Sequence, residues 1–220
     1  MAITYELPLS KWYFEKTSVW TLDYPPFFAY FEWLLARPAA FFDREMVRVQ
    51  NLYYDSLTVI VYQRATVILS DLMFLYGCIR YFQADAAQTR GKFDLLRFLF
   101  NYGSVALLIL DGIHFQYNSM MYGLMILSIA FIKEKSYFKS ALIYAILLNF
   151  KHIYLYFAPC FGLLYLKKVV FKSGSIPKGI LNFIFLGIQT VLVFALSFGP
   201  FLYIGGLDQL AQIASRLFPF

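Results

Sequence analysis

The sequence predicts an all-α protein that crosses a membrane several times. Of its 220 residues, 60% are hydrophobic and only 15% are charged, whereas an ordinary soluble domain has roughly 45–50% apolar and about 25% charged residues. One water-soluble core of this size could not bury 25 Phe and 18 Tyr side chains, so the apolar surplus requires lipid as a second solvent. The apolar residues also form runs that approach the ~20 residues needed to span a bilayer core.

Residues 1–56 differ from the rest of the chain, because charged residues and prolines interrupt their apolar positions. This pattern predicts short helices that lie on the membrane surface and do not cross it. One helix should begin at Pro25 and Pro26, since proline tolerates the first helical turn and keeps the preceding residue extended. Asp23 precedes this helix and is a candidate for its N-terminal cap.

From residue 57 onward, five apolar stretches are candidates for spanning helices: 57–80, 94–111, 117–132, 138–166 and 179–204. The fourth is too long for one crossing, and Asn149, Lys151 and His152 interrupt it. We expect two short crossings there, 138–149 and 152–166, and irregular backbone at membrane depth is tolerated where it lines a cavity. The predicted organisation is an interfacial helical region (1–56), a transmembrane helix bundle (57–204) and the start of a loop (205–220).

Basic residues indicate the orientation of these crossings. Eleven of the nineteen lie in three predicted loops, near 80–97, 133–139 and 167–178, and the positive-inside rule makes that side cytosolic. The opposite side then receives residues 1–56, the 111–118 loop, the 149–152 turn and the 205–220 tail. The net charge of +6 therefore reflects membrane topology, and no nucleic-acid-binding module is visible.

Metal and disulfide chemistry are not expected from this sequence. Its two cysteines, Cys78 and Cys160, both lie inside apolar segments, which favours buried free thiols over a disulfide framework. No His or Cys residues have the spacing of a metal site.

Four polar motifs fall on the predicted non-cytosolic side, and their convergence is the main functional signal in the residues themselves. The motifs are Trp20–Pro26, Asp111–Asn118, Phe150–His152 and Ser215–Phe220. Asp111 and His114 stand three residues apart, as neighbours on one helical turn would, so the carboxylate could orient the imidazole. The alternative is that Asp111 caps the next helix while His114 only packs.

The basic residues of these motifs are candidate anion ligands. Lys151 and His152 lie at the break between two short crossings and could bind a phosphate, although Lys151 could equally extend to the membrane interface. Arg216, beside aromatic residues, has the same two interpretations. Arg64 and Asp71 lie two turns apart on one predicted helix, and a structural role with partners on other helices is favoured for them.

The motif strings resemble the dolichyl-phosphate-glucose glucosyltransferases of N-glycan precursor assembly, and the resemblance covers nearly the whole chain. It is carried by Asp23–Pro26, by HFQYN within Asp111–Asn118, by FKHIYLY at Phe150–Tyr156 and by RLFPF at Arg216–Phe220. The strings FKHIYLY and DYPPFFAYFE favour the enzymes that add the second glucose, in an α-1,3 linkage, over those that add the first.

The resemblance implies a GT-C fold in the endoplasmic-reticulum membrane, with a luminal active site. It implies an inverting transfer in which a carboxylate deprotonates the acceptor hydroxyl and positive groups stabilise the departing lipid phosphate. The substrates would be dolichyl-phosphate glucose and a lipid-linked oligosaccharide, without a further cofactor. Asp23, Asp111 and His114 would serve catalysis, and substrate would contact the following residues: Tyr24, Gln116, Asn118, Lys151, His152 and Arg216.

The sequence departs from the family pattern at both ends. The general base is expected in an Asp-Phe-Glu-like motif after a first transmembrane helix, and neither is present here. Related enzymes also continue beyond the RLFPF string. We therefore expect a fragment that is inactive alone.

Other functions remain open on the sequence. They include a dolichyl-phosphate-dependent mannosyltransferase of the same broad fold, a transporter or scramblase that uses Arg64 and Asp71 on a substrate path, and a non-catalytic membrane subunit. No internal repeat supports a transporter, and a donor swap would separate the two transferases.

Overall fold

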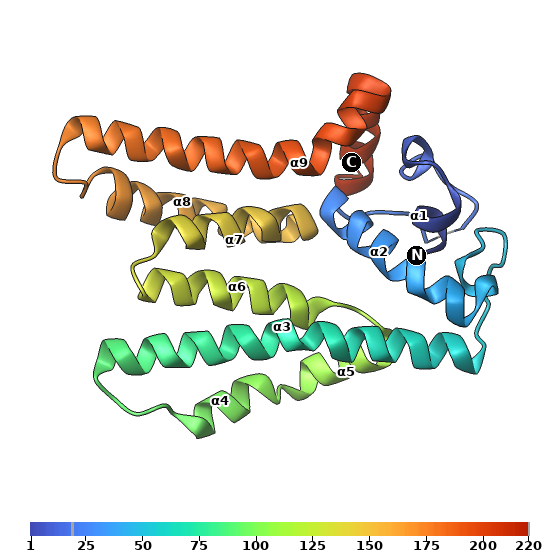
Figure 1. Ribbon diagram of the computed structural model, residues 1–220, viewed down its shortest axis with the longest axis horizontal. Helices are drawn as coiled ribbons and strands as arrows, with labels where there is room; N and C mark the ends of the chain where they lie inside the picture. The colour runs from blue at the N-terminus through green and yellow to red at the C-terminus, as the bar shows by residue number, and fades with distance from the viewer. Residues whose placement is uncertain (19, 220) are drawn as a thin grey trace. The chain divides into compact units, whose positions relative to one another are not determined.

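The computed structural model describes residues 1–18 and 20–219, and these residues form helices and connecting turns without any strand (Figure 1). The all-α prediction is confirmed. Four described helical stretches are long and apolar enough to cross a membrane: Leu57–Thr89, Leu95–His114, His152–Val170 and Ile176–Leu217. Two shorter apolar helices are α6 (Asn118–Lys133) and α7 (Tyr137–Phe150). The chain is a multi-pass membrane protein.

The chain divides into two compact units. The first, here the terminal unit, contains the described residues of Met1–Thr66, Asn149–His152 and Phe194–Phe220. The second, here the central unit, contains Val67–Leu148 and Ile153–Val193. Segments from both ends of the chain therefore fold together in the terminal unit.

The terminal unit begins with α1 (Ala2–Glu6), η1 (Leu9–Lys11) and α2 (Pro26–Phe42). The predicted helix start is confirmed, because α2 begins at Pro26 with Pro25 in the preceding cap position. The predicted cap by Asp23 is wrong. The two prolines move the helix start beyond its reach, and its carboxylate instead accepts a hydrogen bond of 2.7 Å from the Thr21 hydroxyl.

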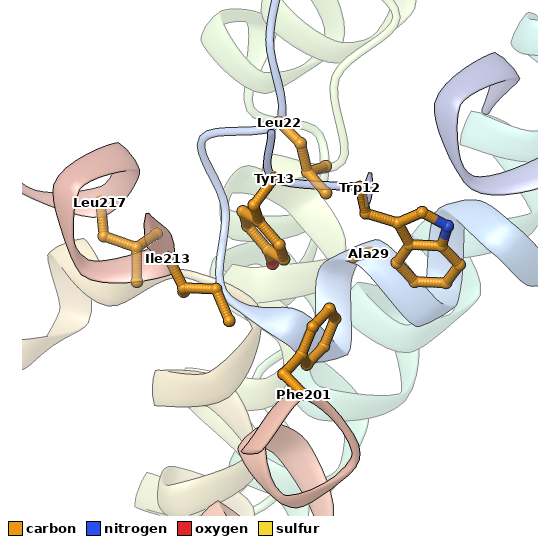
Figure 2. Close-up of a cluster of buried hydrophobic side chains, with 7 residues drawn as sticks. All are labelled: Trp12, Tyr13, Leu22, Ala29, Phe201, Ile213 and Leu217. Atoms are coloured by element: carbon orange, nitrogen blue, oxygen red, sulfur yellow. The ribbon is translucent and has the colours of Figure 1, made fainter. Parts of the chain in front are cut away.

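One buried cluster joins the N-terminal segment, α2 and α9 (Ile176–Leu217). Figure 2 shows its seven buried side chains: Trp12, Tyr13, Leu22, Ala29, Phe201, Ile213 and Leu217. Tyr13 and Phe201 are both 0% exposed, and their ring centroids lie 5.4 Å apart in an edge-on arrangement. Such an aromatic pair contributes about 0.5–1.5 kcal/mol beyond its buried area, so this cluster stabilises the contact between distant parts of the sequence.

The C-terminal part of α9 is helical as far as Leu217, where the sequence predicted the start of a loop at 205. Gly205 and Gly206 break the helix, and Gly206 has φ 63°, which favours glycine. Beyond the break, Leu210, Ile213 and Leu217 recur at helical spacing and pack in the buried cluster. The apolar face that these residues form explains why the helix resumes.

Asp43 ends α2 and starts η2 (Arg44–Val47). One carboxylate oxygen accepts from the Glu45 N–H at 3.0 Å. The other accepts from the Tyr54 hydroxyl at 2.7 Å and the Ser56 hydroxyl at 3.2 Å. The bond from Tyr54 lowers the pKa of Asp43 below its ordinary value of 3.8, against an opposing effect of desolvation, and the other two bonds also lower it. Three hydrogen bonds to the charged form thus hold the connection toward α3 (Leu57–Thr89).

The stability of the terminal unit should therefore depend on pH through Asp43. Because the folded state lowers the Asp43 pKa, this contribution is present above the unfolded pKa of about 3.9 and is lost as the pH falls through the folded value. We expect Asp43→Asn to lower the melting temperature more at pH 7 than at pH 3. Thermal unfolding in detergent between pH 3 and pH 7 measures this difference. The control is Asp55→Asn, because Asp55 is an exposed neighbouring residue. Equal effects at both pH values would contradict the assignment.

The central unit contains helices that run side by side in Figure 1, among them α3, α6 and α7. Two differences from the predicted spans have local causes. The helix α3 continues to Thr89, beyond the predicted end at 80. The predicted span 94–111 is divided into α4 (Leu95–Tyr102) and α5 (Val105–His114), because Gly103 and Ser104 separate the two helices.

The interruption predicted within 138–166 is confirmed. The helix α7 ends at Phe150, and a 3₁₀ segment, η3 (His152–Phe157), begins after Lys151. It continues into α8 (Ala158–Tyr165) and a π-helical turn, η4 (Leu166–Val170). Within the central unit, Tyr144 on α7 donates a 2.7 Å hydrogen bond to the Tyr154 carbonyl, which fixes the 3₁₀ segment against α7.

Two kinds of contact hold α3 against α6. Glycines Gly77 and Gly123 let the two backbones approach: a Cβ atom added at Gly77 would lie 2.5 Å from the Gly123 carbonyl oxygen. Ion pairs join Arg80 to Glu134, just after α6, and Asp85 to Lys133, each at 2.6 Å. Close glycine contacts are typical of packed membrane helices, and the ion pairs lie in the basic region predicted to be cytosolic.

Candidate functional site

Two of the predicted motifs meet in the terminal unit. The Lys151 ammonium lies 6.0 Å from the centroid of the Tyr24 ring. The neighbouring Phe150 ring packs edge-on against Phe27 and Phe31 of α2, with centroid distances of 5.9 and 6.3 Å. Because α2 begins two residues after Tyr24, its first two turns position the Phe150–His152 segment beside the Asp23–Pro26 segment.

His152 connects this pair of segments to the C-terminal motif. Its ring lies 5.3 Å from the Phe218 ring in an edge-on arrangement. Its Nδ1 atom is buried and has no hydrogen-bond partner among the described residues. Three of the four predicted motifs therefore converge in the terminal unit, although Phe220 lies outside the described residues. An imidazole nitrogen without a protein partner can accept a proton from, or donate one to, a bound group.

Asp23 directly precedes Tyr24 in the sequence, and its carboxylate is exposed. Its observed partner is the Thr21 hydroxyl, so most of its hydrogen-bonding capacity faces solvent. The position is suited to contact with a polar ligand such as a sugar hydroxyl. Its role in catalysis stays a prediction.

Arg216 is half-buried and makes contacts that the sequence did not predict. Its Nε donates to the Tyr13 carbonyl and its Nη2 to the Glu15 carbonyl, both at 3.1 Å. Gln212, one turn earlier on α9, donates to the same Tyr13 carbonyl at 2.9 Å. A guanidinium has five N–H donors, so these bonds leave capacity for an anion. Its observed contacts nevertheless hold the N-terminal segment.

Tyr13 is the residue of this site that sequence reasoning missed. Its hydroxyl donates a 2.7 Å hydrogen bond to the Tyr24 carbonyl. Burial holds the pKa of this hydroxyl well above its ordinary value of 10.0, with a further contribution from Tyr30, so it remains a donor at physiological pH. An aromatic residue in an aromatic-rich segment carries no sequence signal for such a contact.

The fourth motif lies in the central unit and centres on Asp111, which is 1% exposed. One carboxylate oxygen accepts from the Asn118 amide at 3.0 Å, and the other accepts from the Ser119 N–H at 2.5 Å. The Asn118 amide also donates to Gln116 at 2.7 Å. Asp111 therefore binds one of the unpaired N–H groups at the start of α6, as an N-terminal cap does.

The predicted pairing of Asp111 with His114 is not formed. The chain leaves α5 through Phe115, which has a left-handed φ of 52°, and this turn returns Asn118 and Ser119 to the carboxylate. His114 is exposed, and no hydrogen bond or ion pair joins it to Asp111 in the described structure. The alternative, in which Asp111 caps the next helix, describes the geometry of Asp111.

Asp71 adds a second carboxylate to this group. Its carboxylate lies close enough to Ser119 and to Asp111 to interact electrostatically with both, and its Oδ1 is buried without a partner in the described part of the chain. The prediction that Asp71 has a partner on another helix is confirmed. No group of three or more His, Cys, Asp or Glu side chains that could hold a metal ion occurs among the described residues.

Comparison with known proteins gives a consistent result. The sequence model of the ALG6, ALG8 glycosyltransferase family matches residues 1–220. A Bos taurus protein named dolichyl pyrophosphate Glc1Man9GlcNAc2 alpha-1,3-glucosyltransferase is 47% identical over 235 residues, which cover 100% of this chain and 44% of the relative. Proteins with the same name are 45% identical in Gibberella zeae, over 228 residues (100% and 44%), and 43% identical in Arabidopsis thaliana, over 221 residues (100% and 42%). The chain thus spans less than half the length of these relatives.

Proposed function

Because the chain belongs to the ALG6, ALG8 glycosyltransferase family, we propose that it forms part of an enzyme that transfers glucose from dolichyl-phosphate glucose to a lipid-linked oligosaccharide. The names of its relatives support a specific step, the addition of an α-1,3-linked glucose to an oligosaccharide that already carries one glucose. The all-helical, multi-pass structure fits the GT-C type of glycosyltransferase.

The observation that carries this proposal is the convergence of three polar segments in the terminal unit. Lys151 lies beside Tyr24, and His152 lies beside Phe218. A glycosyl transfer from a lipid phosphate needs a cation near the departing phosphate and polar groups near the sugar hydroxyls. Lys151 would hold the phosphate, His152 would donate to it or to a sugar, and the exposed Asp23 would contact sugar hydroxyls.

The remaining predicted residues have supporting roles in this proposal. Asp111, Gln116 and Asn118 would shape the start of α6 for sugar binding. His114 would add an exposed polar side chain at the end of α5. Arg216 would add positive potential near the phosphate. We assign no general base among these residues, because the resemblance expects it in an Asp-Phe-Glu-like motif that this sequence does not contain.

The proposed location is the endoplasmic-reticulum membrane, with the transfer site on the luminal side. The support is the distribution of charge: eleven basic residues lie in three segments that the sequence predicts on the side opposite the four motifs, and such basic segments remain cytosolic. A dolichol-linked substrate also requires a site that a membrane lipid can reach.

A transfer assay with two donors and two acceptors tests the proposal. The protein is prepared from a gene extended to the length of its relatives, in microsomes that lack the endogenous enzyme. We expect transfer from dolichyl-phosphate glucose, but not from dolichyl-phosphate mannose, to the one-glucose acceptor. Transfer to the acceptor without glucose would identify the first glucosyltransferase instead, and transfer of mannose would identify a mannosyltransferase. No transfer with any pair would favour a transporter or a non-catalytic subunit.

A further inference from the structure

The side chain and backbone of Tyr13 connect the C-terminal part of α9 to the Asp23–Pro26 segment. We propose that Tyr13 is a positioning residue for the transfer site: Gln212 and Arg216 fix its backbone, and its hydroxyl fixes Tyr24. This inference rests on the proposed function. It also assigns to Arg216 and Gln212 a part in holding the site together, through the Tyr13 carbonyl.

The first half of this connection is a set of hydrogen bonds from α9 to the N-terminal segment. Gln209 donates to the Ser10 carbonyl at 2.6 Å, and Gln212 and Arg216 both donate to the Tyr13 carbonyl, at 2.9 and 3.1 Å. These three side chains are spaced by three and four residues, so they lie on one face of the helix. A polar face of α9 thus binds two carbonyl groups, those of Ser10 and Tyr13, in a segment 199 residues earlier.

The second half is the hydrogen bond from the Tyr13 hydroxyl to the Tyr24 carbonyl, at 2.7 Å. The first α2 hydrogen bonds are accepted by the Pro25 carbonyl, from Phe28 and Ala29. The Tyr24 carbonyl therefore takes no part in the helix and is fixed from outside by Tyr13. Because Tyr13 is fully buried against Phe201, its hydroxyl has little freedom to move.

Tyr24 transmits this position to the groups proposed to act on substrate. Its ring lies 6.0 Å from the Lys151 ammonium and 4.4 Å from the Phe28 ring, and its backbone is bonded directly to Asp23. Loss of the Tyr13 hydroxyl would release the Tyr24 backbone and, with it, the placement of Asp23 and Lys151. Errors of about 1 Å in such placement can reduce rates by as much as ~100-fold.

Tyr13→Phe in the full-length protein tests the proposal, because it removes one hydroxyl and keeps the buried ring. The matched control is Tyr62→Phe: Tyr62 is buried in the same unit and also donates to a backbone carbonyl, that of Leu35. We expect Tyr13→Phe to lower kcat/KM for glucose transfer by roughly 10-fold. This loss lies between that of one hydrogen bond and that of misplacing a substrate-contacting group by about 1 Å. Tyr62→Phe should leave it within about 2-fold at equal thermal stability.

A double-mutant cycle separates positioning from general stability. If Tyr13 acts through Tyr24 on Lys151, Tyr13→Phe should cost much less in a Lys151→Gln background than in the wild type, since the group that it positions is already lost. Independent effects that multiply in the double variant would overturn the proposal. So would equal losses of kcat/KM in Tyr13→Phe and Tyr62→Phe. A wild-type protein with no transfer activity would instead contradict the proposed function.

Discussion

Replacing Gly123 with alanine should strongly destabilise the packing of α3 against α6. An added Cβ atom would lie 2.6 Å from backbone atoms of Met73 and Phe74, and backbone cannot rotate away as the end of a side chain can. The two helices would have to separate, and overpacking of this kind costs about 1–3 kcal/mol. We expect the melting temperature in detergent to fall by several degrees.

The matched control is Gly187→Ala in α9. An added Cβ atom at Gly187 meets nothing within 4 Å, and alanine favours a helix over glycine by about 1 kcal/mol. Gly187→Ala should therefore be neutral or slightly stabilising in the same measurement. A melting temperature for Gly123→Ala that equals that of the control would contradict the close helix contact.

Replacing Asp111 should have the largest effect on activity in the central unit. Asp111→Ala removes the acceptor for the Ser119 N–H and for the Asn118 amide, and each unsatisfied buried group costs about 1–3 kcal/mol. We expect loss of the ordered turn before α6 and a reduction in transfer of roughly 100-fold, comparable to the effect of misplacing a group by ~1 Å. The rate at matched protein abundance measures this.

An exchange of the two side chains separates the structural role of Asp111 from a chemical one. In Asp111→Asn, the one remaining side-chain oxygen can accept from the Ser119 N–H or from the Asn118 amide but not from both, so at the other contact a donor meets a donor. Adding Asn118→Asp restores one donor and one acceptor. If Asp111 only caps α6 and orders the turn, the double variant should recover both stability and transfer. Recovered stability without transfer would show that the carboxylate at position 111 takes part in the reaction.

Features that depend on local composition could be predicted from the sequence. The surplus of apolar residues predicted a membrane environment. Pro25 and Pro26 predicted the start of α2, and polar residues inside an apolar run predicted the break at 149–152. The division at Gly103 and Ser104 also has a local signal, which the hydropathy of the surrounding residues obscured. Hydropathy averages over a window and does not register a single glycine.

Features that depend on distant contacts could not be predicted. The hydrogen bond from Arg216 to the Tyr13 carbonyl joins residues 203 positions apart. Neither an arginine nor a tyrosine in the sequence predicts that the other will be its partner. Asp71 meets Ser119 because α3 packs against α6, which the spacing of Asp71 within its own helix does not reveal. The expected Asp111–His114 pair failed for a related reason: helical spacing holds only within a helix, and the left-handed Phe115 directs the following residues back to Asp111.

The most direct test of the proposed function is complementation in cells that lack the second glucosyltransferase. A gene extended to the full length of the relatives is expressed, and the lipid-linked oligosaccharides are identified by mass spectrometry. The account predicts that the one-glucose intermediate is converted to forms with two or more glucoses, and that Lys151→Gln expressed at equal abundance greatly reduces this conversion. Persistence of the one-glucose intermediate with the wild-type protein, at normal abundance in the endoplasmic reticulum, would contradict it.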